Sequence, residues 1–353
     1  MSIIDLFTKP PPSISSYKPG QLNDAELKQY FEEGYVLVKN YFTEDELLPV
    51  IEDLKWLMDR VAKKLFHARK IKDMYEQADF FKRPTLLNKD FPGFGILLHK
   101  RDHLSKAIRN LWSCEKLLNF AEQVLGTADV MGHPTWNIRC KIPHFQETVV
   151  PWHQDHAYLI GEAEMLIPTA WIPLLNTNRS NGCMEVVPNG HRSGKIATHT
   201  CCAGPTWYVD LAEEEIKSLG VDAKDAVLCE VPFGGVLFIN NLIPHRSLSN
   251  TSDRTRWSLD LRWHKEGTSN CSGVEKSVKM RQADNSVPFK IDWADNIDQI
   301  MEREYNGESV EDTREDDFGT VITGPWMNRW KLVSHNKHTE AFLAEQQKKK
   351  TGN

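Results

Sequence analysis

The sequence predicts an α+β protein in which helices precede a β-rich core and a partly helical extension follows it. Three observations lead to this prediction. The first part of the chain carries segments of helical periodicity, whereas from about Val130 short runs rich in β-branched and aromatic residues lie between turn signals. The last part mixes helical stretches with Trp293, Trp326 and Trp330. Several short strands of this kind indicate a sandwich or barrel, with a jelly roll among the candidates.

We expect one structural domain with three parts. Residues 1–129 would form an N-terminal arm and a mostly helical support, and residues 130–264 would form the β core. Residues 265–353 would form a C-terminal helical appendage that packs on this core. A chain of 353 residues is long enough to bury a core of that size.

The expected helices have recognisable ends. Residues 24–33 lead into Gly34, which suits a helix C-cap. Thr43 to Glu46 form a capping box for a long helix. Its buried stripe is expected to consist of Leu47, Ile51, Leu54, Met58, Val61 and Leu65. A further helix is expected over residues 115–125, where a glycine follows.

The expected strands are short and separated by turns. Asn-Gly and Gly-Gly pairs lie between several of them. The strands would cover residues 35–39, 135–142, 169–175, 183–188, 226–232, 235–239 and 256–263.

Composition and charge exclude several classes of partner. The net charge is −6, the mean hydropathy is −0.48, and no basic stripe with interleaved aromatic residues is present, so no nucleic-acid partner is expected. No apolar stretch could cross a bilayer and no secretory segment opens the chain, so we expect no membrane partner and a cytoplasmic protein with reduced thiols. Adjacent Cys201 and Cys202 suit neither an ordinary disulfide nor a zinc ligand set. A homo-oligomer is compatible with the sequence.

The most informative segment is Pro-Trp-His-Gln-Asp-His at residues 151–156. Residues two apart in a strand point to the same face, so His153 and Asp155 can aim at one point while Gln154 points to the opposite side. An imidazole and a carboxylate are two of the three ligands in the facial triad of non-haem Fe(II) oxygenases. Taken alone, the pair is more typical of a strand-end histidine hydrogen-bonded to a neighbouring carboxylate.

The segment 234–256 favours the metal interpretation. A Gly-Gly turn leads into an apolar strand that ends at His245, the candidate third ligand, and a polar turn precedes a new strand at Arg256. Three ligands on one face of Fe(II) leave room for an α-keto acid and O2. The distal carboxylate of 2-oxoglutarate then needs a fixed cation, for which arginine is best suited. We expect Arg256 to supply it, with Arg254 as the second choice.

The strand over residues 256–263 alternates cleanly between two faces. One face carries Trp257, Leu259, Leu261 and Trp263, and the other carries Arg256, Ser258, Asp260 and Arg262. Two arginines and an aspartate directly after a candidate metal ligand favour the lining of a polar cavity over a wet surface.

At these positions the sequence resembles the phytanoyl-CoA dioxygenase-like (PhyH) family of Fe(II)/2-oxoglutarate-dependent oxygenases. The resemblance covers residues 130–264 and rests on WHQD at 152–155, Trp171, NGCMEVVPNGH at 181–191 and HRSLSNTSDRTR at 245–256. Pro188-Asn189-Gly190-His191 departs from the family's Pro-Gly-Ser-His. The resemblance implies a double-stranded β-helix (jelly roll, cupin-like) catalytic core flanked by helices.

The resemblance also implies a site and a reaction. The iron ligands would be His153, Asp155 and His245, and the residues around 2-oxoglutarate would be Arg256, Ser247 and Trp171. A dioxygenase of this kind uses O2 to oxidise an unactivated C–H bond of a small-molecule metabolite, by hydroxylation or by desaturation or ring closure, and releases succinate and CO2. Iron halogenases on this scaffold replace the carboxylate ligand by a small residue, so Asp155 argues against halogenation.

Two other classes stay open at this point. A non-catalytic metal-binding jelly roll could act as a scaffold or sensor, although such a protein need not keep both the triad and the arginine. A zinc hydrolase on the same ligands would need a general base, and the sequence identifies none.

The candidates for substrate binding are Arg262, His156 and Asn137. Arg262 could equally pair with Asp260, and His156 could be a plain strand-edge residue. Asn137 shares one strand face with Arg139 and Lys141, whose orientation is open. A small polar or amino-acid-like metabolite anchored by Arg262 is at least as compatible as an acyl-CoA, because no basic cluster for CoA phosphates is present.

Two further expectations concern loops and histidines. The connection over residues 192–225, which contains Trp207 and Tyr208, is long enough to be a substrate lid. The histidines without partners at ligand spacing are expected on the surface; they are His191, His199, His264, His335 and His338.

Overall fold

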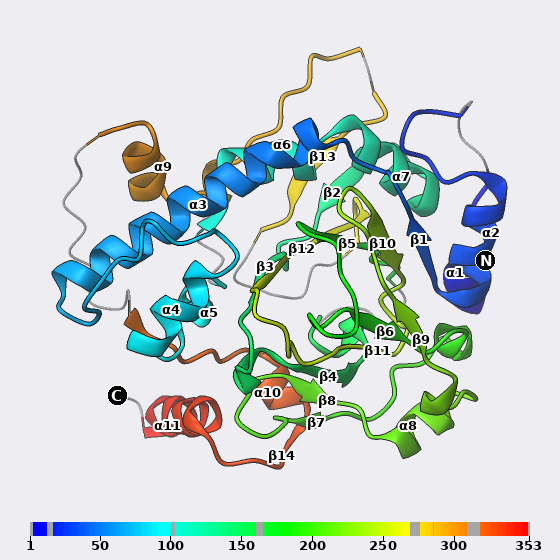
Figure 1. The fold of residues 1–353 in the computed structure, drawn as a ribbon. Helices are drawn as coiled ribbons and strands as arrows, with labels where there is room; N and C mark the ends of the chain where they lie inside the picture. The colour runs from blue at the N-terminus through cyan, green and yellow to red at the C-terminus, as the bar shows by residue number, and fades with distance from the viewer. Residues whose placement is uncertain are drawn as a thin grey trace.

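The computed structural model describes residues 3–12, 17–99, 103–159, 165–268, 276–284, 286–308 and 318–351. Two antiparallel sheets form the double-stranded β-helix core (Figure 1). The large sheet contains β1 (Tyr35–Val38), β10 (Val236–Ile239), β5 (Thr169–Pro173), β12 (Arg256–Lys265), β2 (Val130–Gly132) and β13 (Val278–Arg281), in that order, with β3 (Asn137–Lys141) paired to β12. The small sheet contains β4 (Val150–His153), β11 (His245–Ser247), β6 (Met184–Val186) and β9 (Val227–Cys229).

Helices pack against the large sheet on the side away from the small sheet. One continuous apolar core joins this sheet to α3 (Glu44–His67), α6 (Lys106–Trp112) and α7 (Glu115–Leu125) (Figure 1). The other helices are α1 (Ile3–Thr8), α2 (Asp24–Glu33), α4 (Arg83–Asp90), α5 (Phe94–Leu97), α8 (Glu213–Ser218), α9 (Gln299–Tyr305), α10 (Trp326–Arg329) and α11 (Lys337–Thr351). Within the described ranges, no helix is long and apolar enough to cross a membrane.

The predicted helix ends are confirmed. The first predicted helix, α2, ends at Gly34, whose φ of 88° is a left-handed conformation that glycine adopts without steric cost. The capping box closes at the start of α3, where the Glu46 carboxylate accepts a hydrogen bond of 2.8 Å from the backbone N–H of Thr43. All six residues of the predicted apolar stripe of α3 are buried.

Strand β12 organises the core. It lies between β5 and β3, and its register pairs Asp260 with Trp171 on one side and Arg256 with Lys141 on the other. Its apolar face packs in the main core, whereas Arg256, Asp260 and Arg262 on the other face line an internal pocket. The predicted alternation is therefore confirmed, and both faces of the strand are buried.

A third, small sheet joins the 192–225 connection to the C-terminal extension. It contains β14 (Lys331–Leu332), β7 (Thr200–Cys201) and β8 (Val209–Asp210). The connection is also held to the core, because the Leu211 N–H donates to the carbonyl of Trp152 at 2.8 Å. Cys201 and Cys202 are joined by a disulfide, contrary to the expectation for adjacent cysteines.

Most of the histidines expected on the surface are buried, so that expectation was wrong. His191, His199, His264 and His338 are each at most 2% exposed, and His335 alone of the five is exposed. Their rings are paired with neighbouring groups: His191 Nε2 lies 2.9 Å from the carbonyl of Phe31, and His199 Nδ1 lies 2.8 Å from that of Ala197. The partners of His191 and His199 are backbone carbonyls, which no residue pattern in the sequence identifies.

Candidate metal centre and active site

Three side chains from two neighbouring strands meet at one point inside the core. His153 ends β4 and His245 opens β11, and the two residues are direct partners in the antiparallel register. Oδ1 of Asp155 lies 3.5 Å from Nε2 of His153 and 3.6 Å from Nε2 of His245. All three residues are 3% exposed. The predicted triad is therefore assembled and shielded from water.

The local backbone at Asp155 differs from the predicted strand. The strand ends at His153, and Asp155 begins a 3-10 turn that runs to Ala157. The intervening Gln154 keeps an extended backbone, with φ −103° and ψ 133°, so the side chains on either side of it still converge. As predicted, Gln154 points away from the triad: its Nε2 donates to the carbonyl of Leu242 at 2.7 Å.

Hydrogen bonds orient both histidines as metal ligands. Nδ1 of His153 lies 2.9 Å from the carbonyl of Pro151, and Nδ1 of His245 lies 3.0 Å from the carbonyl of Ile243. A carbonyl only accepts, so each Nδ1 carries the hydrogen and each Nε2 presents its lone pair to the common point. Burial lowers the pKa of His245 to about 4, which keeps its ring neutral. The ligand atoms lie within 4.8 Å of one another, so this donor set fits Fe(II).

The second oxygen of Asp155 is held by two other residues. Oδ2 accepts hydrogen bonds from Thr169 Oγ1 at 3.0 Å and from Arg262, whose Nε and Nη2 lie at 3.1 and 2.9 Å. Burial alone would raise the pKa of Asp155, but Arg262 and the two histidines hold it well below its usual range. Arg262 and the two histidines therefore keep the carboxylate ionised, and Arg262 and Thr169 hold Oδ2 so that Oδ1 is turned toward the histidines.

A positively charged end of the pocket lies beyond the triad. Arg256 is 1% exposed; its Nη1 donates to Ser258 Oγ at 2.7 Å, and its Nη2 donates to Ser247 Oγ at 3.2 Å. Its guanidinium lies over the ring of Trp171 at 5.3 Å, and its buried Nε has no hydrogen-bond partner among the described residues. The second choice, Arg254, lies near the surface 3.9 Å from Asp79.

Lys141 adds a second buried cation beside Arg256. It is 3% exposed, and its Nζ donates to the carbonyl of Leu248 at 2.7 Å. Burial and the charge of Arg256 hold the pKa of Lys141 well below its usual value. No described carboxylate makes an ion pair with Lys141 or Arg256, since Asp260 pairs with Arg139 and Asp155 pairs with Arg262. This end of the pocket therefore fits a carboxylate from a ligand.

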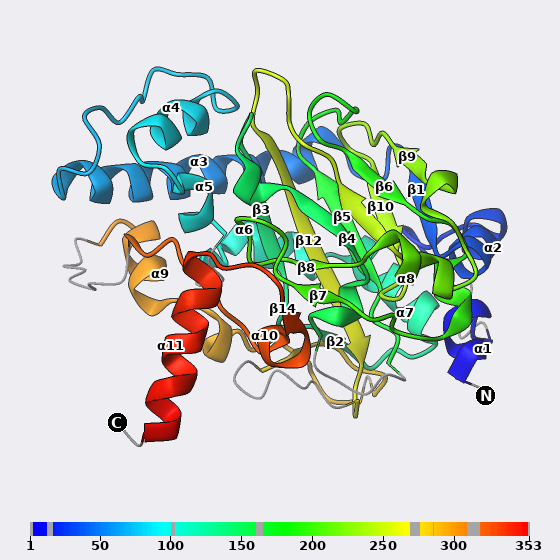
Figure 2. The ribbon, with the colours of Figure 1, turned by 90° about the horizontal axis from the view of Figure 1, so that it is seen from below.

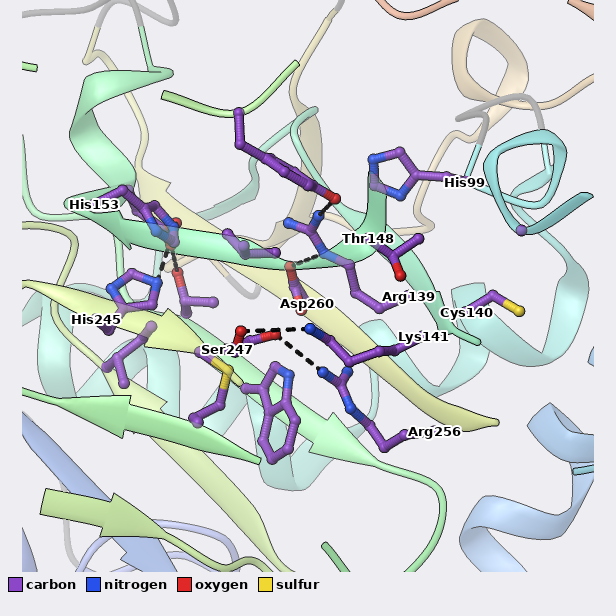
Figure 3. A pocket seen from close by; sticks show the side chains of 18 of the residues that line it. His99, Arg139, Cys140, Lys141, Thr148, His153, His245, Ser247, Arg256 and Asp260 are labelled. Atoms are coloured by element: carbon purple, nitrogen blue, oxygen red, sulfur yellow. Dashed lines mark hydrogen bonds and ion pairs between the residues drawn. The ribbon is translucent and has the colours of Figure 1, made fainter. Parts of the chain in front are cut away.

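The triad and the two cations lie at opposite ends of one inner pocket, shown in Figure 3. Its volume is about 40 Å³, and Ser247, Trp171 and Asp260 line it between the two ends. A larger outer cavity of about 670 Å³ adjoins it and shares His153 and Asp155 as lining residues.

The residues predicted to bind substrate lie in different places. Asn137 lines the outer cavity. Arg262 also lines it, but its guanidinium is engaged by Asp155 and lies 3.7 Å from Asp260. His156 lines neither space; it is fully buried, and its Nδ1 lies 2.7 Å from Asn241 Nδ2.

The sequence patterns do not identify Thr169 as part of the site, and they indicate Lys141 only as a possible lining residue on the strand face of Asn137 and Arg139. Thr169 shares the parity of Trp171 on β5, a signal from which its inward position could have been found. The position of Lys141 beside Arg256 depends on the pairing of β3 with β12, which no local pattern specifies.

Comparisons with known proteins agree with this geometry. Residues 30–258 match the sequence model of the phytanoyl-CoA dioxygenase (PhyH) family. Phytanoyl-CoA dioxygenase domain-containing protein 1 of Mus musculus is 24% identical over 270 residues, which cover 67% of this chain and 87% of that protein. Phytanoyl-CoA dioxygenase of Arabidopsis thaliana is 22% identical over 258 residues, which cover 69% and 88%. The non-heme monooxygenase ThoJ, in its apo structure, shares the fold with a TM-score of 0.50 at 16% identity, over 80% of this chain and 93% of ThoJ.

Proposed function

This chain belongs to the phytanoyl-CoA dioxygenase (PhyH) family of Fe(II)/2-oxoglutarate-dependent oxygenases, and we propose that it oxidises an unactivated C–H bond of a small-molecule metabolite. One observation carries the proposal. A histidine–aspartate–histidine triad and two buried basic side chains, Arg256 and Lys141, which have no ion-pair partner among the described residues, lie at opposite ends of the same inner pocket. This arrangement matches a cosubstrate that chelates a metal at one end and carries a carboxylate at the other.

Different residues of the pocket would bind the iron and the 2-oxoglutarate. His153, Asp155 and His245 would hold the iron, and Arg256, Lys141 and Ser247 would bind the distal carboxylate of 2-oxoglutarate, with Trp171 beside it. When bound, iron and 2-oxoglutarate use O2 to oxidise the substrate and yield succinate and CO2. The chain itself orients the ligands through Arg262 and Thr169 and excludes water by burying every ligand.

The alternatives fit the site less well. A non-catalytic metal-binding scaffold or sensor has no need for two buried cations that lack a carboxylate partner. No specific observation favours a zinc hydrolase: Asp260, the other carboxylate that lines the inner pocket, forms an ion pair with Arg139 at 2.8 Å. Halogenation is also disfavoured, because Asp155 supplies the carboxylate ligand that a halogenase lacks and so occupies the position that a halide would need.

Anaerobic titration with Fe(II) and 2-oxoglutarate tests the proposal. We expect the weak visible absorption band of the iron–keto-acid chelate, and we expect His153→Ala to abolish it. Arg256→Ala should raise the concentration of 2-oxoglutarate needed for the band by at least about tenfold, because a charge-assisted bidentate contact is lost. Arg254→Ala, a surface arginine two residues away, and His335→Ala, an exposed histidine, are the matched controls.

A wild-type protein without the band, or an Arg254→Ala variant that weakens 2-oxoglutarate as strongly as Arg256→Ala, would contradict the proposal. Product mass then separates the outcomes: hydroxylation adds an oxygen atom, whereas desaturation or ring closure removes two hydrogens. The cytoplasmic location and the absence of a nucleic-acid partner stay predictions.

A further inference from the structure

The outer cavity has the size of a substrate site, and its position places an occupant beside the triad. Its volume of about 670 Å³ lies within the usual range of small-molecule pockets, about 300–1,000 Å³. The inner pocket, at about 40 Å³, has no room for a substrate of several rings. The body of any such substrate must therefore lie in the outer cavity, with its reacting carbon next to His153 and Asp155.

One wall of this cavity comes from the C-terminal extension. Residues 321–326, Phe342 and the last turns of α11 line it, opposite core residues such as Tyr158 and Trp207. In Figure 2, α10, α11 and β14 lie together alongside β7 and β8. The match to the PhyH family ends at residue 258, so this wall lies outside the family's common region. Its side chains can therefore give this chain a substrate preference of its own.

The wall is fixed to the core by directional contacts. Nε1 of Trp326 donates to the carbonyl of Trp207 at 3.0 Å, and Nε1 of Trp330 donates to the carbonyl of Ala157 at 2.9 Å. Nη1 of Arg329 donates to the carbonyl of His156 at 2.9 Å, and β14 pairs with β7. These bonds join the extension to the segment that follows the metal ligand Asp155, so the wall keeps a defined distance from the triad.

The cavity surface mixes polar side chains with a group of aromatic and apolar ones. Tyr158, Leu159, Met165, Trp207, Ile322 and Phe342 lie around it. Flat side chains of this kind bind rings through stacked or edge-to-face contacts. An occupant with one or more rings would bury apolar surface against both the core and the extension.

The two arginines that line the cavity are already paired with carboxylates. Arg139 donates to Asp260 at 2.8 Å, and Arg262 donates to Asp155 at 2.9 Å. Glu345 and Lys349, which carry opposite charges and lie one turn apart on α11, also line the cavity. Among the described lining residues, no cluster of free cations could bind the phosphates of a nucleotide-linked substrate.

We propose that the substrate is an uncharged molecule with one or more rings, held between the catalytic core and the wall formed by residues 321–326, Phe342 and the last turns of α11. This inference rests on the proposed function, which supplies the reaction that the substrate undergoes. It differs from the amino-acid-like metabolite that the sequence left open, because Arg262, the possible anchor, is engaged by Asp155. It also differs from an acyl-CoA, whose phosphates find no cation cluster among the described residues.

A binding experiment on the metal-free protein tests the cavity. The probe is N-phenyl-1-naphthylamine, an uncharged two-ring-system fluorophore, titrated alone and against coenzyme A. We expect saturable binding of one probe per chain and no displacement by coenzyme A. Val321→Asp should weaken probe binding about tenfold, because it places a charge on the apolar wall.

Val333→Asp is the matched control. Both valines lie in the extension and are similarly exposed, at 43% for Val321 and 52% for Val333, so neither change buries a charge in the core. Only Val321 lines the cavity. Equal effects of the two substitutions, absence of saturable probe binding, or displacement of the probe by coenzyme A would overturn the proposal.

A second assay links the cavity to the reaction. We compare how strongly three classes of compound stimulate succinate formation: neutral ring compounds, acyl-CoA thioesters and amino acids. We expect the ring compounds to stimulate it. Stronger stimulation by acyl-CoA thioesters or by amino acids would overturn the inference. The two failures are distinguishable. Probe binding without a chelate band would remove the proposed function alone, whereas a chelate band without probe binding would remove this inference alone.

Discussion

The contact between Arg262 and Asp155 leads to a quantitative prediction about iron binding. Arg262 donates two hydrogen bonds, of 3.1 and 2.9 Å, to the carboxylate oxygen that faces away from the histidines. Arg262→Leu would leave that oxygen with Thr169 as its one side-chain donor among the described residues. The carboxylate would then be free to rotate and would lose the nearby charge that keeps it ionised.

The expected effect is a weaker affinity for Fe(II). Loss of an outer partner of a metal ligand typically costs about 10- to 100-fold in affinity, which corresponds to about 1.4–2.8 kcal/mol. Because the ion pair is buried, the metal-free variant should also lose about 3–5 kcal/mol of unfolding free energy. The affinity for 2-oxoglutarate should change little, because Arg256 and Lys141 lie at the other end of the pocket.

The assay is an anaerobic Fe(II) titration at saturating 2-oxoglutarate, followed by the chelate absorbance. Chemical denaturation shows first that the variant is folded at the assay temperature. Arg246→Leu is the control, because Arg246 lies next to His245 on β11 but pairs with Glu185 outside the pocket. A folded Arg262→Leu variant with wild-type Fe(II) affinity would refute the role of Arg262 in positioning Asp155. Arg262 would then again be a candidate for binding substrate.

Three further predictions concern stability. Folding lowers the pKa of Lys141. At pH values between this lowered pKa and the ordinary 10.5, the unfolded chain binds more protons than the folded protein, so the unfolding free energy should rise with pH. Lys141→Met should remove this contribution, and a variant whose unfolding free energy has the same pH slope as the wild type in chemical denaturation would contradict the prediction. Gly34→Ala should lower the unfolding free energy by about 1–2 kcal/mol, because alanine disfavours the φ of 88° and its Cβ would lie 2.5 Å from His191 Nδ1; a neutral effect would refute this. Leu261→Ala, a fully buried core change, should cost about 2–5 kcal/mol by denaturation while leaving the chelate band in place.

Several features of this protein follow from the sequence by itself. The helix ends at Gly34 and at the Thr43–Glu46 capping box, and the alternation of β12, depend on residues that are close in the chain. The same is true of the two short segments that carry His153, Asp155 and His245. Local order of this kind is encoded by propensity and periodicity, so a single sequence is sufficient to predict it.

Other features were decided by the tertiary structure alone. Lys141 lies beside Arg256 only because β3 pairs with β12 in one register. Arg262 contacts Asp155 although the two residues are far apart in the chain, and no sequence pattern connects them. The cavity wall from the C-terminal extension likewise depends on how Trp326 and Trp330 bond to the core. Antiparallel register and side-chain packing join residues far apart in the chain, and their free energy depends on the whole core rather than on any local segment.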